Sequence, residues 1–162
     1  MDKQDILMTS LLIIGILVGL ILFALLAAGL VKKLRRNKYK DLDQMEGHDF
    51  EYFCAGLLEK RGYKDVEVTT GSRDYGVDIL AKKDGISFAI QCKCYSTPVG
   101  VKAVQEAYAG RDYYDCMIGV VLTNQYFTAP AIEAAAKLKI LLWDRTYLEN
   151  MMEEELWASK QR

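Results

Sequence analysis

The feature that most constrains this chain is an uncharged segment close to its N-terminus. Ile6–Val31 contains 26 consecutive residues without a charged side chain. As a helix rising about 1.5 Å per residue, this segment is long enough to cross the roughly 30 Å hydrocarbon core of a bilayer with some tilt. The residues before it include Asp2, Lys3 and Asp5, which do not form the basic region of a signal peptide. The sequence therefore predicts one transmembrane helix over residues 6–31.

Basic residues follow the apolar segment directly and predict its orientation. Six Lys and Arg residues lie between positions 32 and 40, whereas Lys3 is the only one that precedes the segment. Loops that remain in the cytoplasm carry an excess of Lys and Arg. We therefore expect residues 1–5 outside the cell membrane and the C-terminal part in the cytoplasm. The basic cluster is also suited to contact anionic lipid headgroups.

Two glycines in the apolar segment bear on the oligomeric state. Gly15 and Gly19 form a Gly-x-x-x-Gly motif, which allows two membrane helices to approach closely. A homodimer is one interpretation of this motif. The other interpretation is a membrane helix without a helical partner, because glycine is common in membrane helices generally.

The remainder of the chain is acidic and long enough for one domain. Residues 41–162 carry 14 Lys and Arg against 20 Asp and Glu, so affinity for DNA must come from local cations and not from bulk charge. A domain of about 105 residues buries a single core and leaves no room for a second. We expect a basic linker over 32–45, the folded domain over 46–150, and a helix end and tail over 151–162.

Two apolar runs in this domain carry polar residues that buried strands rarely contain. Asp78 lies on the first run, and Gln91 and Lys93 lie on the alternating run Ile86–Cys94. An unpaired charge in a buried strand costs several kcal/mol, so such residues are usually paired, metal-bound or catalytic. A period of two places Gln91 and Lys93 on one face. A hairpin-type turn at Lys82–Gly85 would bring Asp78 toward the same end as Gln91.

A carboxylate, an amide and an ammonium group are the groups that metal-assisted phosphodiester hydrolysis requires. Asp78, Gln91 and a neighbouring backbone carbonyl would supply oxygen ligands to Mg²⁺ or Mn²⁺. Lys93 would orient the attacking water or help deprotonate it, and would stabilise charge on the phosphorane. In the alternative interpretation, Asp78 merely ends a strand and Lys93 lies on the solvated face of an edge strand. Residue types and spacing leave both interpretations open.

The rest of the pattern predicts an α/β domain with a mixed sheet flanked by helices. Apolar positions from Phe50 onward recur at helical spacing, and Gly62 is a plausible stop for this helix. Further periodicity predicts a strand near 66–68, a helix over 101–113, a strand over 116–123, a helix over 129–138, a strand over 140–143 and a last helix that begins near Asp144.

Several motifs in this order have a family resemblance. They are Phe50-Glu51, Gly62-Tyr63, the run Gly71–Asp78, Gln91-Cys92-Lys93, and Leu122-Thr123-Asn124 followed by Phe127-Thr128 and Ala131. Together they resemble the Mrr-like restriction endonuclease domain of the PD-(D/E)xK nuclease superfamily, over nearly all of the segment 46–150. The resemblance implies a restriction-endonuclease-like sheet, Asp78 and Gln91 at a metal site, Lys93 as the catalytic lysine, and Glu51 as an accessory acid.

Two positions depart from the usual pattern of that superfamily. Tyr75 stands where the family usually has a small residue, which would reshape the turn before Asp78. Gln91 replaces the commoner acid, although glutamine is usual in the Mrr-like branch. Because a neutral ligand should bind the metal more weakly, Glu51 gains importance. Its alternative role is to stabilise the positive N-terminal end of its helix.

Contacts to DNA are expected from a few residues around the cleft. The basic candidates are Arg73, Lys82, Lys83 and Lys102. Thr123 and Asn124 end a strand in a loop, so they are candidates for contacts with the DNA backbone. In the alternative interpretation they form a turn that local hydrogen bonds hold.

The sequence as a whole predicts a membrane-anchored, Mg²⁺- or Mn²⁺-dependent DNA endonuclease of the restriction type. The alternative function is a nuclease-like domain without catalysis that binds DNA or a protein partner at the membrane. The acidic composition and the neutral Gln91 keep this alternative open.

Overall fold

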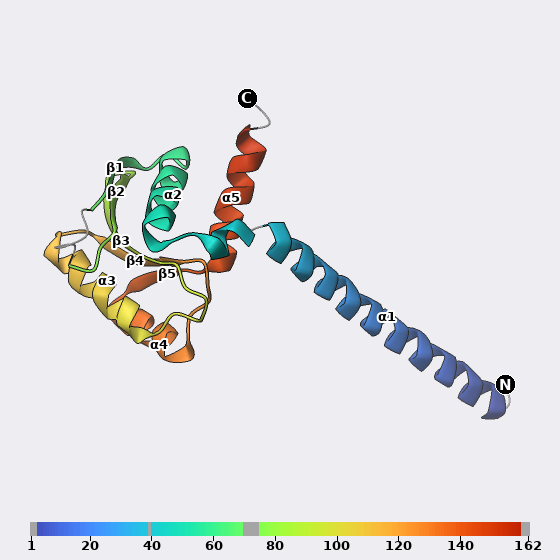
Figure 1. The fold of residues 1–162 in the computed structure, drawn as a ribbon. Coiled ribbons are helices and arrows are strands. Elements are labelled where there is room, and N and C mark those ends of the chain that lie inside the picture. The colour runs from blue at the N-terminus through green and yellow to red at the C-terminus, as the bar shows by residue number, and fades with distance from the viewer. Residues whose placement is uncertain (1–2, 39, 70–74, 160–162) are drawn as a thin grey trace. The chain divides into compact units, whose positions relative to one another are not determined.

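The computed structural model describes residues 3–38, 40–69 and 75–159 (Figure 1). The chain divides into two units, the first ending at Lys40 and the second starting at Asp41. The first unit is one long helix, α1 (Lys3–Lys38). Its segment Ile13–Leu30 is long and apolar enough, by length and composition, to cross a membrane.

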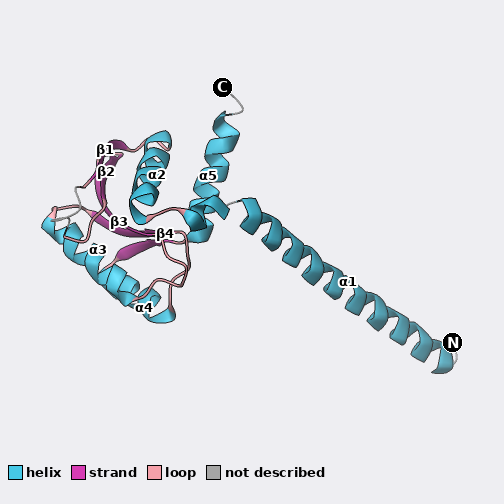
Figure 2. Ribbon diagram, in the orientation of Figure 1, coloured by secondary structure: helices cyan, strands magenta, loops and turns pink. Residues whose placement is uncertain are grey.

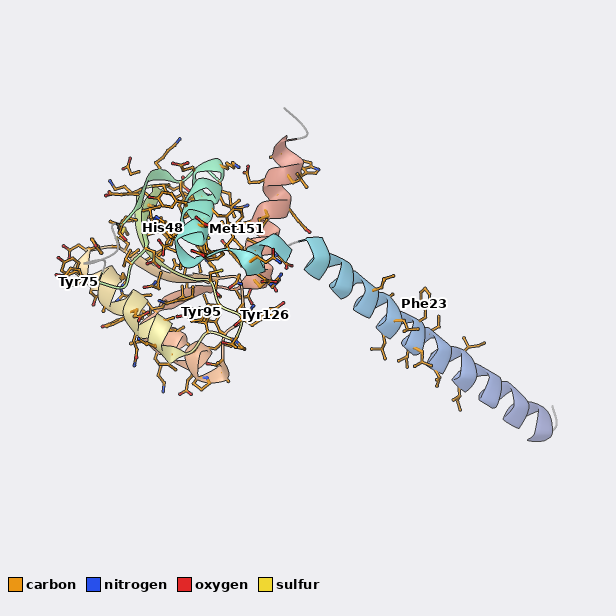
Figure 3. All side chains as sticks on the ribbon, viewed as in Figure 1. Phe23, His48, Tyr75, Tyr95, Tyr126 and Met151 are labelled. Carbon is orange, nitrogen blue, oxygen red and sulfur yellow. The ribbon has the colours of Figure 1, made fainter. Side chains whose placement is uncertain are left out.

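The side chains of that segment are exposed, and Phe23 shows how they project from the helix (Figure 3). No atom of the described chain would approach a Cβ added at Gly15 or Gly19 within 4 Å.

The second unit is an α/β domain whose mixed five-stranded sheet confirms the predicted fold class. The strand order is β1-β2-β3-β4-β5, with antiparallel pairs up to β3 and parallel pairs from β3 to β5. The elements in chain order are η1 (Lys40–Gln44), α2 (Gly47–Lys60), β1 (Lys64–Val68), β2 (Ile79–Lys83), β3 (Ile86–Lys93), α3 (Val101–Tyr113), β4 (Ile118–Thr123), α4 (Ala129–Leu138), β5 (Ile140–Trp143) and α5 (Arg145–Ser159).

Helices cover both faces of the sheet. Figures 1 and 2 show α2 on one side of the sheet, and α3 and α4 on the other. The helix α5 contacts α2, and an ion pair of 2.5 Å joins its Glu154 Oε2 to Nη1 of Arg61, the residue that follows α2. The interior strand β4 is buried along most of its length, as expected for a strand covered on both faces.

The hairpin of β2 and β3 fixes the register on which the polar residues depend. Its two turn residues, Asp84 and Gly85, both have positive φ values, of 52° and 79°. Two-residue turns of this kind match the right-handed twist of the strands that they join. The ladder pairs Ile79 with Ile90, and Asp78 N donates to the carbonyl oxygen of Ile90 at 2.9 Å. The register therefore places Asp78 opposite Gln91.

The strand β4 starts two residues later than the predicted range 116–123. Asp115 adopts a left-handed φ of 49°, and the amide of Cys116 donates to the carbonyl oxygen of Arg111 at 3.0 Å. Asp115 and Cys116 terminate α3, so β4 can begin only after them.

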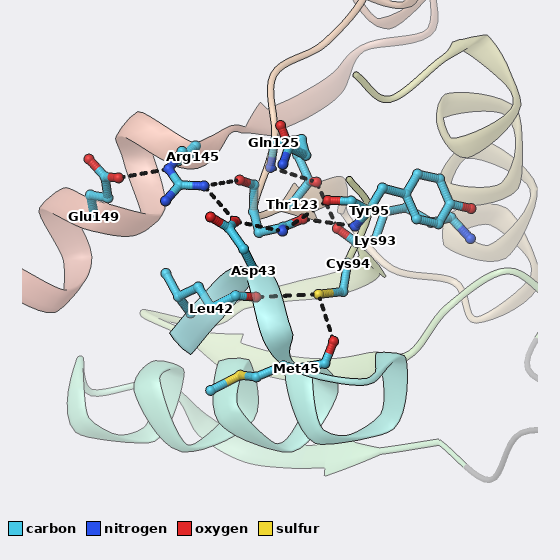
Figure 4. A network of polar contacts seen from close by, with 11 residues as sticks. Leu42, Asp43, Met45, Lys93, Cys94, Tyr95, Thr123, Gln125, Arg145 and Glu149 are labelled. Atoms are coloured by element: carbon cyan, nitrogen blue, oxygen red, sulfur yellow. Dashed lines mark hydrogen bonds and ion pairs between the residues drawn. The ribbon is translucent and has the colours of Figure 1, made fainter. Parts of the chain in front are cut away.

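The segment just before α2 packs on the domain, although the sequence analysis assigned it to the linker. Leu42 is 2% exposed. Asp43 Oδ1 accepts hydrogen bonds from Arg145 Nη1 at 2.6 Å and Asn124 Nδ2 at 3.2 Å (Figure 4). The thiol of Cys94 donates to the carbonyl oxygens of Leu42, at 3.6 Å, and Met45, at 3.3 Å. We call these residues, Leu42–Met45, the entry segment.

The helix α3 lies very close to the turn that precedes Asp78. A Cβ added at Gly110 would lie 2.2 Å from Val77 Cγ2 and 2.9 Å from the carbonyl oxygen of Tyr75. The absence of a side chain at position 110 is therefore what allows this close approach.

We expect Gly110→Ala to destabilise the domain although alanine favours helices. Overpacking costs about 1–3 kcal/mol, which exceeds the gain of roughly 1 kcal/mol in helix propensity. Gly56→Ala on α2 is the matched control, because an added Cβ there meets no atom within 4 Å. That change should stabilise the domain by about 0.5–1 kcal/mol. Urea unfolding of the full chain in mild detergent, followed by the fluorescence of the buried Trp143, measures both, and equal effects of the two changes would contradict this packing.

Candidate active site

Asp78 and Gln91 are in direct contact inside the domain. Their residues are 8% and 4% exposed, and the side-chain amide of Gln91 donates to Asp78 Oδ2. The same carboxylate oxygen accepts from the backbone amide of Cys92 at 2.6 Å. Gln91 Nε2 also donates to the carbonyl oxygen of Cys92 at 3.2 Å. The predicted pairing of β2 with β3 thus brings a carboxylate and an amide together.

Lys93 lies two residues beyond Gln91 and on the same face of β3, as the alternation requires. Its ammonium is 2.9 Å from Glu106 Oε2 on α3. The side chains of Lys93 and Glu106 are 17% and 29% exposed, so this ion pair is largely shielded from water. Lys102, one helical turn before Glu106, approaches its other carboxylate oxygen at 3.7 Å and is itself exposed.

The surroundings of Lys93 favour its charged form. Burial lowers the pKa of the ammonium, but the ion pair with Glu106 and the negative charge of Asp78 outweigh burial and raise the pKa above its ordinary value. Lys93 is therefore a cation at neutral pH. An ammonium that is charged at neutral pH is suited to orient water and stabilise negative charge, and poorly suited to accept a proton.

Glu51 lies on α2, which covers the face of the sheet opposite to α3 and α4. Its carboxylate is 3.3 Å from His48 Nδ1. A hydrogen bond to Cys54 and burial raise the pKa of Cys92 well above its ordinary value, and the charges of Asp78 and Glu51 raise it further. Glu51 is therefore within electrostatic range of the end of β3, but from the side of the sheet that α2 covers.

The turn before Asp78 has an unusual backbone that α3 supports. Tyr75 and Gly76 have φ values of 46° and 81°. A Cβ added at Gly76 would lie 2.8 Å from the carbonyl oxygen of Glu106, so a glycine is required there. The ring of Tyr75 stacks on that of Tyr113, with centroids 3.7 Å apart. Tyr75, at the position where the sequence departs from the family pattern, thus occupies a left-handed conformation.

Two of the basic DNA candidates lie at the wrong end of the hairpin. Lys82 is bound to Asp65 at 2.9 Å, and Lys83 donates to the carbonyl oxygen of Arg61 at 3.1 Å. Both belong to the turn end of β2, whereas Asp78 precedes the start of that strand. The expectation that they surround the site is therefore wrong. Lys102 does lie beside it, and Arg73 falls outside the described residues.

Thr123 and Asn124 are buried, which corrects the expectation that they contact DNA. Thr123 Oγ1 donates to the carbonyl oxygen of Lys93 at 2.7 Å. Asn124 accepts from the backbone amide of Tyr95 at 2.9 Å and donates to the Tyr95 carbonyl at 3.0 Å (Figure 4). Their polar groups hold the end of β3 in place, so the alternative of local hydrogen bonds is the correct one.

Glu106 is the charged residue of this site that the sequence analysis missed. It lies on the helix predicted over 101–113, next to the buried positions Ala103, Val104 and Ala107. The available signal was its position one turn after Lys102, on the border of the apolar face. That position does not predict which strand residue Glu106 will contact.

The donor set at Asp78 fits a hard divalent cation. Asp78 supplies a carboxylate oxygen and Cys92 a backbone carbonyl oxygen, whereas Gln91 directs Nε2 at both of them and would have to turn its side-chain amide to offer Oε1. Oxygen ligands of this kind suit Mg²⁺ or Mn²⁺ and are a poor match for zinc. Among the described residues, no three His, Cys, Asp or Glu side chains form a metal-binding group. A cation here would thus depend on one carboxylate, on neutral ligands and on the substrate phosphate.

Comparisons with known proteins identify the fold and the family of this chain. Three solved structures share the fold: the protein of unknown function AF1548, the DNA modification-dependent restriction endonuclease AspBHI, and the MspJI restriction endonuclease in complex with a 27-mer oligonucleotide. They are 24%, 20% and 20% identical to this chain, with TM-scores of 0.56, 0.56 and 0.54. A comparison with curated protein sequences finds no match.

The chain covers only part of these proteins. The alignments include 65%, 75% and 74% of this chain, but 64%, 34% and 30% of the lengths of AF1548, AspBHI and MspJI. The family model of the Mrr_cat restriction endonuclease matches residues 42–152, which is more than half of the chain and includes the entry segment. The chain therefore belongs to the Mrr-type restriction endonuclease family.

Proposed function

We propose that this protein is a divalent-metal-dependent DNA endonuclease anchored to the membrane by α1. The observation that carries the proposal is the contact of buried Asp78 with Gln91, with Lys93 two residues further along the same face. Burying a carboxylate and most of an ammonium group costs stability, so a functional role is the explanation for their presence at these two positions. In a restriction endonuclease family, the cleavage of a phosphodiester bond is such a role.

Asp78 and the carbonyl oxygen of Cys92 would hold the cation, together with Gln91 once its side-chain amide has turned to present Oε1 in place of Nε2. When bound, the cation would polarise the scissile phosphate and lower the pKa of a bound water. The backbone amide of Cys92 keeps the Asp78 carboxylate in place through its 2.6 Å hydrogen bond. Lys93, as a cation, would orient the attacking water and stabilise charge as the phosphorane forms. This assignment favours the electrostatic role of Lys93 over proton abstraction.

The DNA would meet few cations on this domain. Lys102 is exposed beside the site, and the acidic excess of residues 41–162 opposes bulk attraction to DNA. Binding should therefore be modest and strongly dependent on salt. MspJI was solved with an oligonucleotide and AspBHI depends on DNA modification, so methylated and unmethylated substrates both belong in the test.

The direct test is cleavage of plasmid DNA by the full chain in detergent, with Mg²⁺, Mn²⁺ or EDTA. We expect cleavage that requires the metal. Asp78→Asn and Lys93→Met should each reduce the rate at least about 100-fold, because each removes a group that acts on the developing charge. Lys82→Met is the matched control, since that lysine lies at the far end of the hairpin.

The result can also favour the alternative function. If folded wild-type protein cleaves no plasmid, and DNA binding is the same in wild type, Asp78→Asn and Lys93→Met, the domain is a DNA tether without catalysis. Circular dichroism of each variant shows whether it is folded, so a loss of activity cannot be confused with unfolding.

The neutral Gln91 generates a second prediction. Gln91→Glu places a second carboxylate beside Asp78 and removes the amide that donates to it. Without metal, repulsion between the carboxylates should lower stability by about 1–3 kcal/mol. With metal, the added charge should lower the Mg²⁺ concentration for half-maximal cleavage several-fold. Thermal unfolding with and without Mg²⁺ measures the first effect. An unchanged Mg²⁺ requirement would count against a metal at Gln91.

The membrane anchor makes a separate prediction. Its support is the exposed apolar surface of Ile13–Leu30 and the basic residues that follow this segment. The full chain should remain in the membrane fraction after washing with 1 M salt or alkaline carbonate, whereas residues 41–162 should be released. Release of both proteins by salt would show that charge alone holds the chain there.

The Gly15 and Gly19 motif supports a homodimer as part of the same proposal. Cross-linking in membranes should then trap a dimer of the wild type and less dimer of Gly15→Leu/Gly19→Leu. Monomer alone in both proteins would rule the dimer out. Two copies would provide one active site for each DNA strand.

A further inference from the structure

We propose that Glu106 is the positioning residue for Lys93: it holds the lysine beside Gln91 and Asp78 in the free protein, and a DNA phosphate then replaces it. The inference rests on the proposed nuclease function and adds to it a residue of α3. Glu106 would act through Lys93 and would not touch the substrate itself.

The first observation is the geometry of the ion pair. Lys93 Nζ lies 2.9 Å from Glu106 Oε2, and the pair connects the end of β3 to the middle of α3. A lysine side chain has four flexible bonds and loses about 2 kcal/mol of rotamer entropy when it is fixed in one position. Holding the side chain close to its working position before the substrate arrives leaves only a short turn, from Glu106 to the phosphate, to be made in the complex.

The second observation is that the backbone of the same residue supports the Asp78 side of the site. Gly76, two residues before Asp78, is packed so closely on Glu106 that an added Cβ would lie 2.8 Å from its carbonyl oxygen. Glu106 therefore touches the turn before Asp78 with its main chain and Lys93 with its carboxylate. One residue sets the spacing between the two halves of the site.

The third observation explains how Lys93 can leave Glu106. Lys102 Nζ lies 3.7 Å from the second carboxylate oxygen of Glu106 and belongs to the same helix. When Lys93 turns to a phosphate, Lys102 still compensates the charge of Glu106. The exchange thus replaces one ion pair by another and leaves no isolated buried charge.

This arrangement has opposite consequences for binding and for catalysis. The carboxylate of Glu106 repels a phosphate and competes for Lys93, so it weakens the binding of DNA. It also keeps Lys93 in place, so it speeds cleavage. A residue that only stabilised the fold would instead support both.

The experiment compares wild type with Glu106→Gln, which keeps the side-chain length and removes the charge. Binding of a fluorescent duplex is measured in EDTA, and cleavage is measured in Mg²⁺, with the full chain in detergent. We expect binding to be about three- to tenfold tighter. The dependence of the binding constant on salt should also be steeper, by about the amount that one additional phosphate contact causes. We expect kcat to fall roughly 10- to 100-fold and KM to fall or stay unchanged.

Two further variants make the outcome specific to Lys93. Glu133→Gln is the matched control, because it removes the same charge from an i,i+4 pair with Lys137 on the surface of α4. It should change neither binding nor kcat more than about twofold. In a Lys93→Met background, Glu106→Gln should lose most of its effect on binding, since the lysine that it would release is absent.

Other results would overturn the inference. Weaker binding together with slower cleavage and a lower melting temperature would show that Glu106 is structural. If excess Mg²⁺ restored the activity of Glu106→Gln, Glu106 would be a metal ligand. Absence of cleavage by the wild type would contradict the proposed nuclease function alone, because the binding measurements in EDTA would still decide the relation of Glu106 to Lys93.

Discussion

The site depends on the register between β2 and β3. A shift by one residue in an antiparallel pair moves every side chain to the other face of the sheet, so it would separate Asp78 from Gln91. The two-residue turn at Asp84 and Gly85 prevents that shift. Its positive φ values are those of a two-residue hairpin turn, and this loop length fixes which residues of the two strands pair. The buried apolar residues Ile79 and Ile90, which pair next to the site, reinforce it.

Close packing of α3 adds the second half of the arrangement. The glycines at 76 and 110 let the helix lie against the turn before Asp78, and this contact brings Glu106 within reach of Lys93. A nuclease site on two strands alone would leave the lysine without a fixed partner. The helix thereby connects the turn that precedes the carboxylate of Asp78 with the strand that carries the ammonium of Lys93.

Much of this structure follows from sequence patterns because those patterns are local. Alternation along Ile86–Cys94 placed Gln91 and Lys93 on one face, and the hairpin turn placed Asp78 opposite Gln91. The errors concern contacts between distant segments. The strand ending at Thr123 suggested an open loop, but the backbone of Tyr95 satisfies the polar groups of Asn124. Glu106 was missed because its partner is set by helix packing on the sheet. Lys82 and Lys83 could have been excluded, since one strand length separates them from Asp78.

The entry segment determines where force would reach the domain. The chain enters through Leu42, which is buried, and Asp43, which is bound to Arg145 (Figure 4). Arg145 also donates to Glu149 at 2.9 Å and to the carbonyl oxygen of Asn124 at 3.2 Å, so the load would be shared between α5 and the end of β4. Cys94, which bonds to the carbonyls of Leu42 and Met45, directly follows Lys93. A mechanical pull on the N-terminal helix would therefore act first on the residues next to Lys93, and only later on the exposed edge strand β1.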